Sequence, residues 1–143
     1  MHLKIPTTRA SGASLPTVAS DYTAGYDLHA CLERPVTLEP LQRRVISTGL
    51  CLSIPAGFTG LISPRHGLAV RHGITLLNAP GIVSADDRDD VSLVLLNLGE
   101  RPYTIEPGER IAQIVFIHTL RTVFIPAVGL APLRSPVPEA EPC

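Results

Sequence analysis

The densest group of side chains that could do chemistry is an acidic segment in the second half of the chain. Asp86, Asp87, Asp89 and Asp90 surround a single arginine, Arg88. Ca²⁺ and Mg²⁺ prefer carboxylate oxygens as ligands, so a direct metal site is one interpretation. The spacing does not match a calcium-binding loop, and such a cluster repels phosphate unless a divalent ion intervenes. We therefore favour a solvated polar turn over a metal site.

Serine, histidine and aspartate also occur in the combination that nucleophilic catalysis uses. In such a triad the histidine takes the serine proton, and the carboxylate orients the histidine ring. Ser84, His66 and Asp86 supply the three residue types. No feature of the sequence brings them within hydrogen-bond distance of one another, so we do not expect a triad.

The composition is that of a single globular domain. Its 143 residues are 45% hydrophobic, enough to bury one core. The formal net charge is −1 and the basic residues form no stripe, so we expect no nucleic-acid partner. No apolar run approaches the length that spans a bilayer, so we expect no membrane partner. Cys31, Cys51 and Cys143 lack metal-ligand spacing, which predicts reduced thiols in a cytoplasmic protein.

The segments that must position these side chains are short and extended. Runs rich in β-branched residues alternate with proline and glycine, and no stretch keeps a helical apolar period for three turns. We predict an all-β domain with one short helical piece at Gly67–Arg71 and a polar hairpin tip at Ser84–Asp90. The expected strands are Leu3–Ile5, Val36–Leu38, Val45–Ser47, Leu50–Ile54, Phe58–Ile62, Val91–Asn97, Tyr103–Ile105 and Ile111–Ile117.

The composition changes near the C-terminus. Proline recurs there with alanine, glutamate and serine, at Pro126, Pro132, Pro136, Pro138 and Pro142. We predict one β-barrel domain over residues 1–125 and an extended or disordered proline-rich tail over residues 126–143.

Four segments, read in order along the chain, resemble the motifs of the trimeric dUTPase family. Residues 24–30 read AGYDLHA against the family's AGYDLxA, and residues 64–69 read PRHGLA against PRSGLA. Residues 81–90 read GIVSADDRDD against a pattern like GxIDxDYRGE, and residues 107–113 read PGERIAQ, as in the family. Each motif alone is a weak signal. Four in order, without an insertion from Pro55 through Phe116, are not explained by chance.

The resemblance implies a fold, a ligand and a reaction. Enzymes of this family hydrolyse dUTP to dUMP and pyrophosphate with Mg²⁺, so dUTP or a related nucleotide is the implied ligand and Mg²⁺ the implied cofactor. The implied fold is a distorted jelly-roll barrel that assembles as a homotrimer, with three active sites at subunit interfaces. The chemistry requires an oriented water, a base and cations that neutralise the phosphates. A shared fold does not by itself establish activity.

The phosphate side of the family site is largely retained. By the resemblance, Asp27 is a catalytic position that supports a Mg²⁺–triphosphate arrangement through water. Arg65 and Gln113 stand at positions that order the site and contact phosphate, and Gly67 belongs to the same phosphate-binding second motif. The residues alone leave other interpretations open, because Asp27 could cap a turn and Gln113 could lie on an edge strand.

The nucleoside side is retained in part. Asn78 matches the position that hydrogen-bonds uracil, helped by main-chain groups of Gly81 and Val83. A plain turn asparagine is the other interpretation. The family's tyrosine, whose ring lies against the deoxyribose and excludes a 2′-hydroxyl, is replaced by Asp87.

The positions closest to the chemistry are changed. The family's water-activating aspartate is Ser84, and a serine hydroxyl is no general base near neutral pH. The phosphate-contacting serine of the second motif is His66, and the family's Gly-Glu pair is Asp89-Asp90. The glycine-rich fifth motif, which closes over the nucleotide, has no counterpart beyond Arg134-Ser135. Losing it removes phosphate-binding amides and the lid that excludes water.

The combination of retained and changed motif residues leaves three alternative functions. The first is a degenerate dUTPase homologue whose hydrolysis is lost or strongly reduced. The second is a working dUTPase in which Asp86 or a bound water replaces the base. The third is a non-catalytic nucleotide- or partner-binding regulatory module on the same scaffold. The dCTP deaminase branch shares the fold, but the intact AGYDL and PGERIAQ segments favour the dUTPase side.

Overall fold

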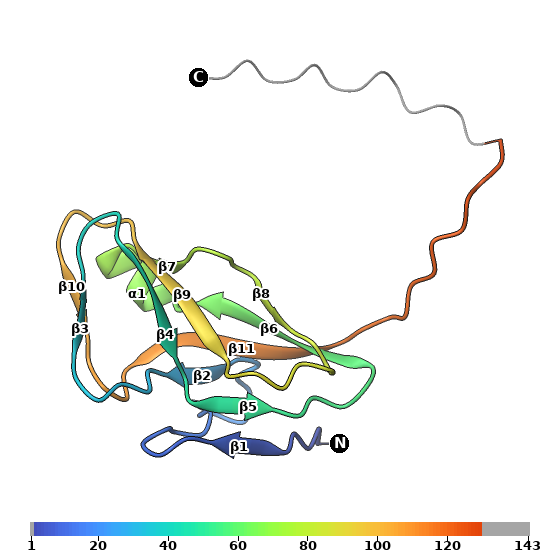
Figure 1. Cartoon of the computed structure of the whole chain (residues 1–143), viewed down its shortest axis with the longest axis horizontal. Helices are drawn as coiled ribbons and strands as arrows, with labels where there is room; N and C mark the ends of the chain where they lie inside the picture. Colours follow the sequence, from blue (N-terminus) through green and yellow to red (C-terminus); the bar gives the residue numbers. More distant parts are fainter. Residues whose placement is uncertain (1, 130–143) are drawn as a thin grey trace.

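Short antiparallel strands and one helix make up the domain (Figure 1). The computed structural model describes residues 2–129. Their elements, in chain order, are β1 Thr7–Arg9, β2 Tyr26–His29, β3 Val36–Leu38, β4 Arg43–Ser47, β5 Leu50–Leu52, β6 Phe58–Pro64, α1 His66–His72, β7 Ile74–Leu76, β8 Gly81–Val83, β9 Ser92–Asn97, β10 Tyr103–Ile105 and β11 Arg110–His118. The predicted all-β class is confirmed, and the predicted helical piece is α1.

The strands form four sheets. Their orders are β1–β5, β10–β3, β2–β11–β6–β8 and β4–β9–β7. Within the described part of the chain, no continuous ladder joins the four sheets into a closed barrel. The architecture is therefore a set of packed sheets, and the expected jelly-roll barrel is open at the seams between them.

One apolar core lies between the sheets. β9 shows how the sequence builds it, because Leu93 and Leu95 are buried while Val94 between them is only partly buried. This period of two places one face of the strand against the core. Leu28 and Ile114 are completely buried in the same way. The remaining buried apolar residues include Leu38, Leu50, Ile74, Ile105 and Ile111.

Two polar side chains that are buried in this core form hydrogen bonds there. The Asn97 side-chain amide donates to the carbonyls of Leu38 (2.9 Å) and Arg101 (2.8 Å), and its oxygen accepts from Gly99 N–H at 2.8 Å. The Thr48 hydroxyl donates to the Val91 carbonyl at 2.7 Å. Both side chains have no solvent exposure, so these bonds remove the cost of burying them.

Two predictions about local structure were wrong. Residues 3–5 form no strand, and β1 begins after Pro6, which has no N–H to extend the ladder. Ser84–Asp90 is not a hairpin tip, because β8 before it pairs with β6 whereas β9 after it pairs with β4 and β7. This segment, which we call the acidic loop, therefore crosses from one sheet to another. β1, β2, β7 and β8 were not predicted.

The described chain beyond β11 leaves the body of the domain (Figure 1). Thr119 N–H still donates to the Gly57 carbonyl at 2.8 Å, but the apolar side chains of Leu120, Phe124 and Ile125 are exposed. The predicted tail lies outside the described residues from position 130 onward. Within residues 2–129, no helix is long and apolar enough to cross a membrane.

Candidate active site around Asp27

Three strands of the largest sheet bring the retained motif residues into one row. Asp27 on β2 lies opposite Gln113 on β11, and Gln113 lies opposite Ser63 on β6. Residues that oppose each other in antiparallel strands share a face of the sheet. Because β11 is flanked on both sides, the edge-strand interpretation of Gln113 was wrong.

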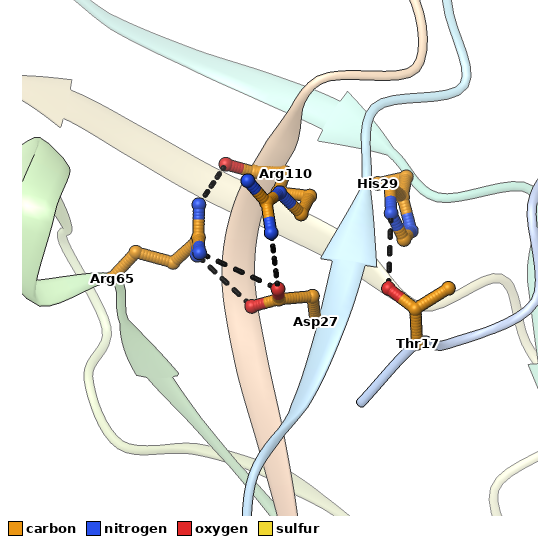
Figure 2. Close-up of polar contacts among 5 residues, drawn as sticks. All are labelled: Thr17, Asp27, His29, Arg65 and Arg110. Carbon is orange, nitrogen blue, oxygen red and sulfur yellow. Dashed lines mark hydrogen bonds and ion pairs between the residues drawn. The ribbon is translucent and has the colours of Figure 1, made fainter. Parts of the chain in front are cut away.

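The carboxylate of Asp27 is held by two guanidinium groups (Figure 2). Arg65 Nε lies 2.9 Å from Asp27 Oδ1, and Arg110 Nη1 lies 3.4 Å from Asp27 Oδ2. The Arg65 side chain also approaches the Arg110 carbonyl, with an Nη1–O distance of 3.5 Å. Asp27 is only 15% exposed, so these interactions are partly shielded from water. The turn-cap interpretation of Asp27 was therefore wrong, since the residue lies within β2.

Arg65 is placed by the junction between β6 and α1. Its backbone is extended (φ −82°, ψ 126°), and its carbonyl accepts from the N–H groups of Leu68 and Ala69, each at 3.1 Å. The helix ends about two turns later at Gly73, which adopts the left-handed conformation with φ 69°. This sharp strand-to-helix turn directs the Arg65 side chain back across the sheet toward Asp27 (Figure 2).

Gly25 leaves room for the Gln113 side chain. A Cβ at position 25 would lie 3.0 Å from Gln113 Oε1. Glycine in the first motif therefore allows the amide of Gln113 to lie against the backbone that precedes Asp27. This contact explains why the first and fourth motifs belong to one site.

Two further residues complete the surroundings of Asp27, and sequence reasoning did not single out either. Arg110 on β11 opposes His29 on β2, and a register shift follows along β11 between Arg110 and Ala112. His29 Nε2 lies 3.4 Å from Thr17 Oγ1 (Figure 2), and His29 Nδ1 is buried with no hydrogen-bond partner within the described residues. Burial lowers the pKa of His29, as do Arg110 and Arg65, whereas Asp27 opposes the shift. The signal for Arg110 was its place in PGERIAQ.

The residues of the third motif lie apart from the Asp27 row in space. In the β6–β8 register, Val83 opposes Gly60, so Ser84 follows at the level of Thr59, near the β6 end that is remote from Arg65. The register places Ser84 about four residues along β6 from the Asp27 row, which is about 13 Å. Ser84 is exposed. One chain therefore does not bring Ser84 and Asp27 together.

The other predicted nucleotide contacts lie away from the Asp27 row or at its margin. Asn78 is exposed in the turn between β7 and β8, and it is followed by Gly81 and Val83 on β8. Within the described chain, His66 at the start of α1, Ser84 and Asp86 form no side-chain hydrogen bond with one another.

The acidic loop is folded by its own side chains. Asp87 N–H donates to the Ser84 carbonyl at 3.2 Å, and Asp89 N–H donates to Asp87 Oδ1 at 3.1 Å. Arg88 Nη1 donates to the Asp87 carbonyl at 2.6 Å and to the Ala85 carbonyl at 2.8 Å. Among the described residues, no three His, Cys, Asp or Glu side chains gather as a metal site would need. The loop is built as a polar turn.

The two described cysteines are free thiols, as predicted. Cys51 Sγ donates to the Arg88 carbonyl at 2.8 Å and so connects β5 to the acidic loop. Cys31 Sγ lies 3.8 Å from the Ser11 carbonyl. Cys143 lies outside the described residues.

Comparison with known sequences places this site in a known family. A family model described as dUTPase matches residues 11–131. A deoxyuridine 5′-triphosphate nucleotidohydrolase of Aquifex aeolicus is 47% identical over 112 residues, covering 78% of this chain and 75% of that protein. The protein of the same name from Wolbachia pipientis wMel is 49% identical over 102 residues, covering 71% and 67%.

Solved structures show the same fold. A dUTPase of Staphylococcus bacteriophage 80alpha, determined with dUpNHpp, has a TM-score of 0.79 and 24% identity, covering 90% of this chain and 97% of that one. A dUTPase from phage phi11 of S. aureus, described with a structural Mg(II) ion, has a TM-score of 0.77 and 21% identity, covering 89% and 97%. With the family model matched over most of its length, the chain belongs to the dUTPase family.

Proposed function

We propose that this dUTPase-family protein binds dUTP or a related nucleotide and that its hydrolysis is lost or strongly reduced. The observation that carries the proposal is Ser84, which stands where the family has its water-activating aspartate. A hydroxyl can hydrogen-bond a water but does not take its proton near neutral pH. Loss of a positioned base costs about 10²–10⁴ in rate.

The retained half of the site supports nucleotide binding. Arg65 and Arg110 carry two positive charges beside the single carboxylate of Asp27, and the Gln113 amide lies on the same face. Guanidinium groups form strong, charge-assisted hydrogen bonds to phosphate oxygens. We assign phosphate binding to Arg65, Gln113 and the second-motif residues His66 and Gly67.

The nucleoside is assigned to the third-motif side. Asn78 and the backbone of Gly81 and Val83 are the proposed uracil contacts. Asp87 is the proposed neighbour of the sugar, where it supplies no aromatic ring to exclude a 2′-hydroxyl. Asp87 already accepts a hydrogen bond from Asp89 N–H, which supports a structural role for it in the loop.

The surroundings of Asp27 fit a Mg²⁺ ion that arrives with the nucleotide. Two guanidinium groups at 2.9 and 3.4 Å leave the Asp27 carboxylate little excess negative charge with which to hold a cation alone. Mg²⁺ commonly keeps several waters and is held jointly by substrate phosphates and one or two carboxylates. Asp27 would contact such an ion through water, and the ion would neutralise phosphate charge.

A homotrimer is the proposed assembly. The family resemblance implies it, and the separation of Ser84 from the Asp27 row gives a structural reason. A site that uses both groups requires a second copy of the chain to bring its acidic loop beside Asp27. Exposed apolar side chains on and beside β8, Ile82 (66%) and Leu77 (52%), are available for such an interface. Light scattering at micromolar concentration should give the trimer mass, and a monomer would contradict this assembly.

A pyrophosphate-release assay tests the loss of hydrolysis. The full chain and the Aquifex aeolicus relative are incubated side by side with dUTP and Mg²⁺. We expect the relative to turn over and this chain to remain about a hundredfold slower or more. Turnover by this chain in the usual enzyme range, about 1–10³ s⁻¹, would show that the catalytic proposal is wrong.

A still-active enzyme is the second candidate. Its support is the close similarity to proteins named as nucleotidohydrolases, together with Asp86, an exposed carboxylate two residues after Ser84. If the chain is active, Asp86→Asn should abolish the activity, whereas Asp90→Asn should not. Calorimetry with dUpNHpp then tests the third candidate, a regulatory module. Absence of binding at millimolar ligand would leave a scaffold for a protein partner.

A further inference from the structure

A second basic pocket lies between α1 and the turn that precedes β10. Its volume is about 560 Å³. The helix contributes Arg71 and His72 to its lining, the turn contributes Arg101, and β10 contributes Tyr103. None of these side chains belongs to the Asp27 row, and the sequence motifs assigned none of them to the nucleotide.

The pocket forms where two backbone segments touch. A Cβ on Gly73 would lie 2.5 Å from the Gly99 nitrogen, and a Cβ on Gly99 would lie 2.3 Å from the His72 carbonyl oxygen. Leu98 N–H donates to the Gly73 carbonyl at 2.9 Å. The end of α1 and the turn at position 99 are therefore held together by backbone contact, which fixes the two halves of the pocket relative to each other.

The walls are ordered by aromatic packing and a hydrogen bond. The His72 and Tyr103 rings lie with their centroids 4.8 Å apart. The Tyr103 hydroxyl donates to Glu109 Oε1, and the other oxygen of Glu109 accepts from Glu106 N–H at 2.9 Å. Burial and then the Glu109 carboxylate raise the pKa of Tyr103, so its hydroxyl remains a donor. The Glu109 carboxylate is thus occupied with Tyr103 and the backbone.

The two arginines of this pocket lack protein partners. Within residues 2–129 the ion pairs found are those of Arg65 and Arg110 with Asp27. No side-chain hydrogen bond of Arg71 or Arg101 occurs in the same residues. The Arg71 side chain folds back along α1 toward Gly67. Its Nη2 lies 2.9 Å from the position that a Cβ on Gly67 would occupy.

We infer that this pocket binds a small phosphorylated anion, with Arg71 and Arg101 as its two guanidinium ligands. Arg71 and Arg101, neither of which has an ion-pair partner within residues 2–129, line the pocket from different segments, and its lining also includes the exposed Glu100. The planar donor fork of arginine matches the oxygens of a phosphate group. Free phosphate or pyrophosphate and the phosphate end of a second nucleotide share this chemistry. The inference is independent of the proposed hydrolytic defect.

Calorimetry with pyrophosphate tests the inference on the full chain. Arg65→Gln serves as the background, so that the Asp27 site contributes little. Adding Arg71→Gln or Arg101→Gln should lower the affinity by about tenfold or more. Arg43→Gln, on an exposed position of β4, removes the same charge elsewhere and should change the affinity less than about twofold.

Two results would overturn the inference. One is no pyrophosphate binding by the Arg65→Gln protein at millimolar ligand. The other is an equal loss in Arg43→Gln and Arg101→Gln, which would indicate general charge attraction. Thermal unfolding of each variant checks that the fold is intact, and Arg101→Lys, which keeps the charge but loses the fork, provides a milder substitution if Arg101→Gln is unstable.

The source of the anion is settled by comparing ligands. If dUpNHpp binds the Arg65→Gln background and Arg101→Gln weakens it as much as it weakens pyrophosphate, the pocket accepts a nucleotide tail. If only pyrophosphate or phosphate shows this dependence, the pocket takes a free anion. Either pattern supports the inference, and a loss of dUTP hydrolysis alone does not affect it.

Discussion

Arg65 Nε lies 2.9 Å from Asp27 Oδ1 and so joins the second motif to the first across the intervening strand β11. The same carboxylate receives Arg110 from β11 itself. The three groups come from three neighbouring strands or their ends, so a single chain brings together the residues to which we assign phosphate binding.

Replacing Arg65 by glutamine should weaken binding of dUpNHpp by about tenfold to a hundredfold. The substitution removes a charge-assisted donor to phosphate and also releases Asp27. Calorimetry measures the affinity, and Arg44→Gln on the exposed face of β4 is the matched control. An unchanged affinity in Arg65→Gln would show that nucleotide does not occupy the Asp27 row.

Ser84→Asp alone should not restore full hydrolysis. By the proposed assignment, Asp87 would still stand in place of the sugar-facing tyrosine. We expect a rate at least about tenfold below that of the Aquifex aeolicus relative in the pyrophosphate assay. Recovery to the rate of that relative would show that Ser84 is the single defect.

Asn97→Ala should destabilise the domain by about 2–4 kcal/mol. The substitution leaves the carbonyls of Leu38 and Arg101 and the N–H of Gly99 without their buried partner. Denaturant unfolding followed by circular dichroism gives the free energy of unfolding. Asn78→Ala, at an exposed turn position, should change it by less than about 0.5 kcal/mol. Similar values for the two variants would contradict the assigned role of Asn97.

The stability of the domain should fall as the pH drops below 6.5, the ordinary pKa of histidine. Burial lowers the pKa of His29 in the folded chain, so the unfolded chain takes up this proton first. The stability that comes from neutral His29 is fully present above the pKa that His29 has in the unfolded chain. It is lost as the pH falls to the lower pKa that His29 has in the folded chain. His29→Gln should therefore lose less stability than the wild type between about pH 7 and pH 5. The exposed His2→Gln should behave as the wild type does, and a parallel loss in His29→Gln would exclude His29 as the cause.

The sequence by itself determined the family, the β class and the helix. Four ordered motifs carry the family, period-two runs predict strands such as β9 and β11, and a glycine-flanked apolar piece predicts α1. The sequence also predicts, through the motif resemblance, that Ser84 stands at the base position. These features are local, because each depends on residue types at fixed spacing along the chain.

Only the tertiary structure decided which strands are neighbours. The alternation of buried and exposed residues specifies the faces of a strand but not its partners. For this reason the sequence predicts a hairpin tip where the acidic loop joins two sheets, and it leaves Gln113 an edge position although β11 is flanked on both sides. The pairing of Arg110 with Asp27 depends on a register between residues 83 positions apart, which no local pattern encodes.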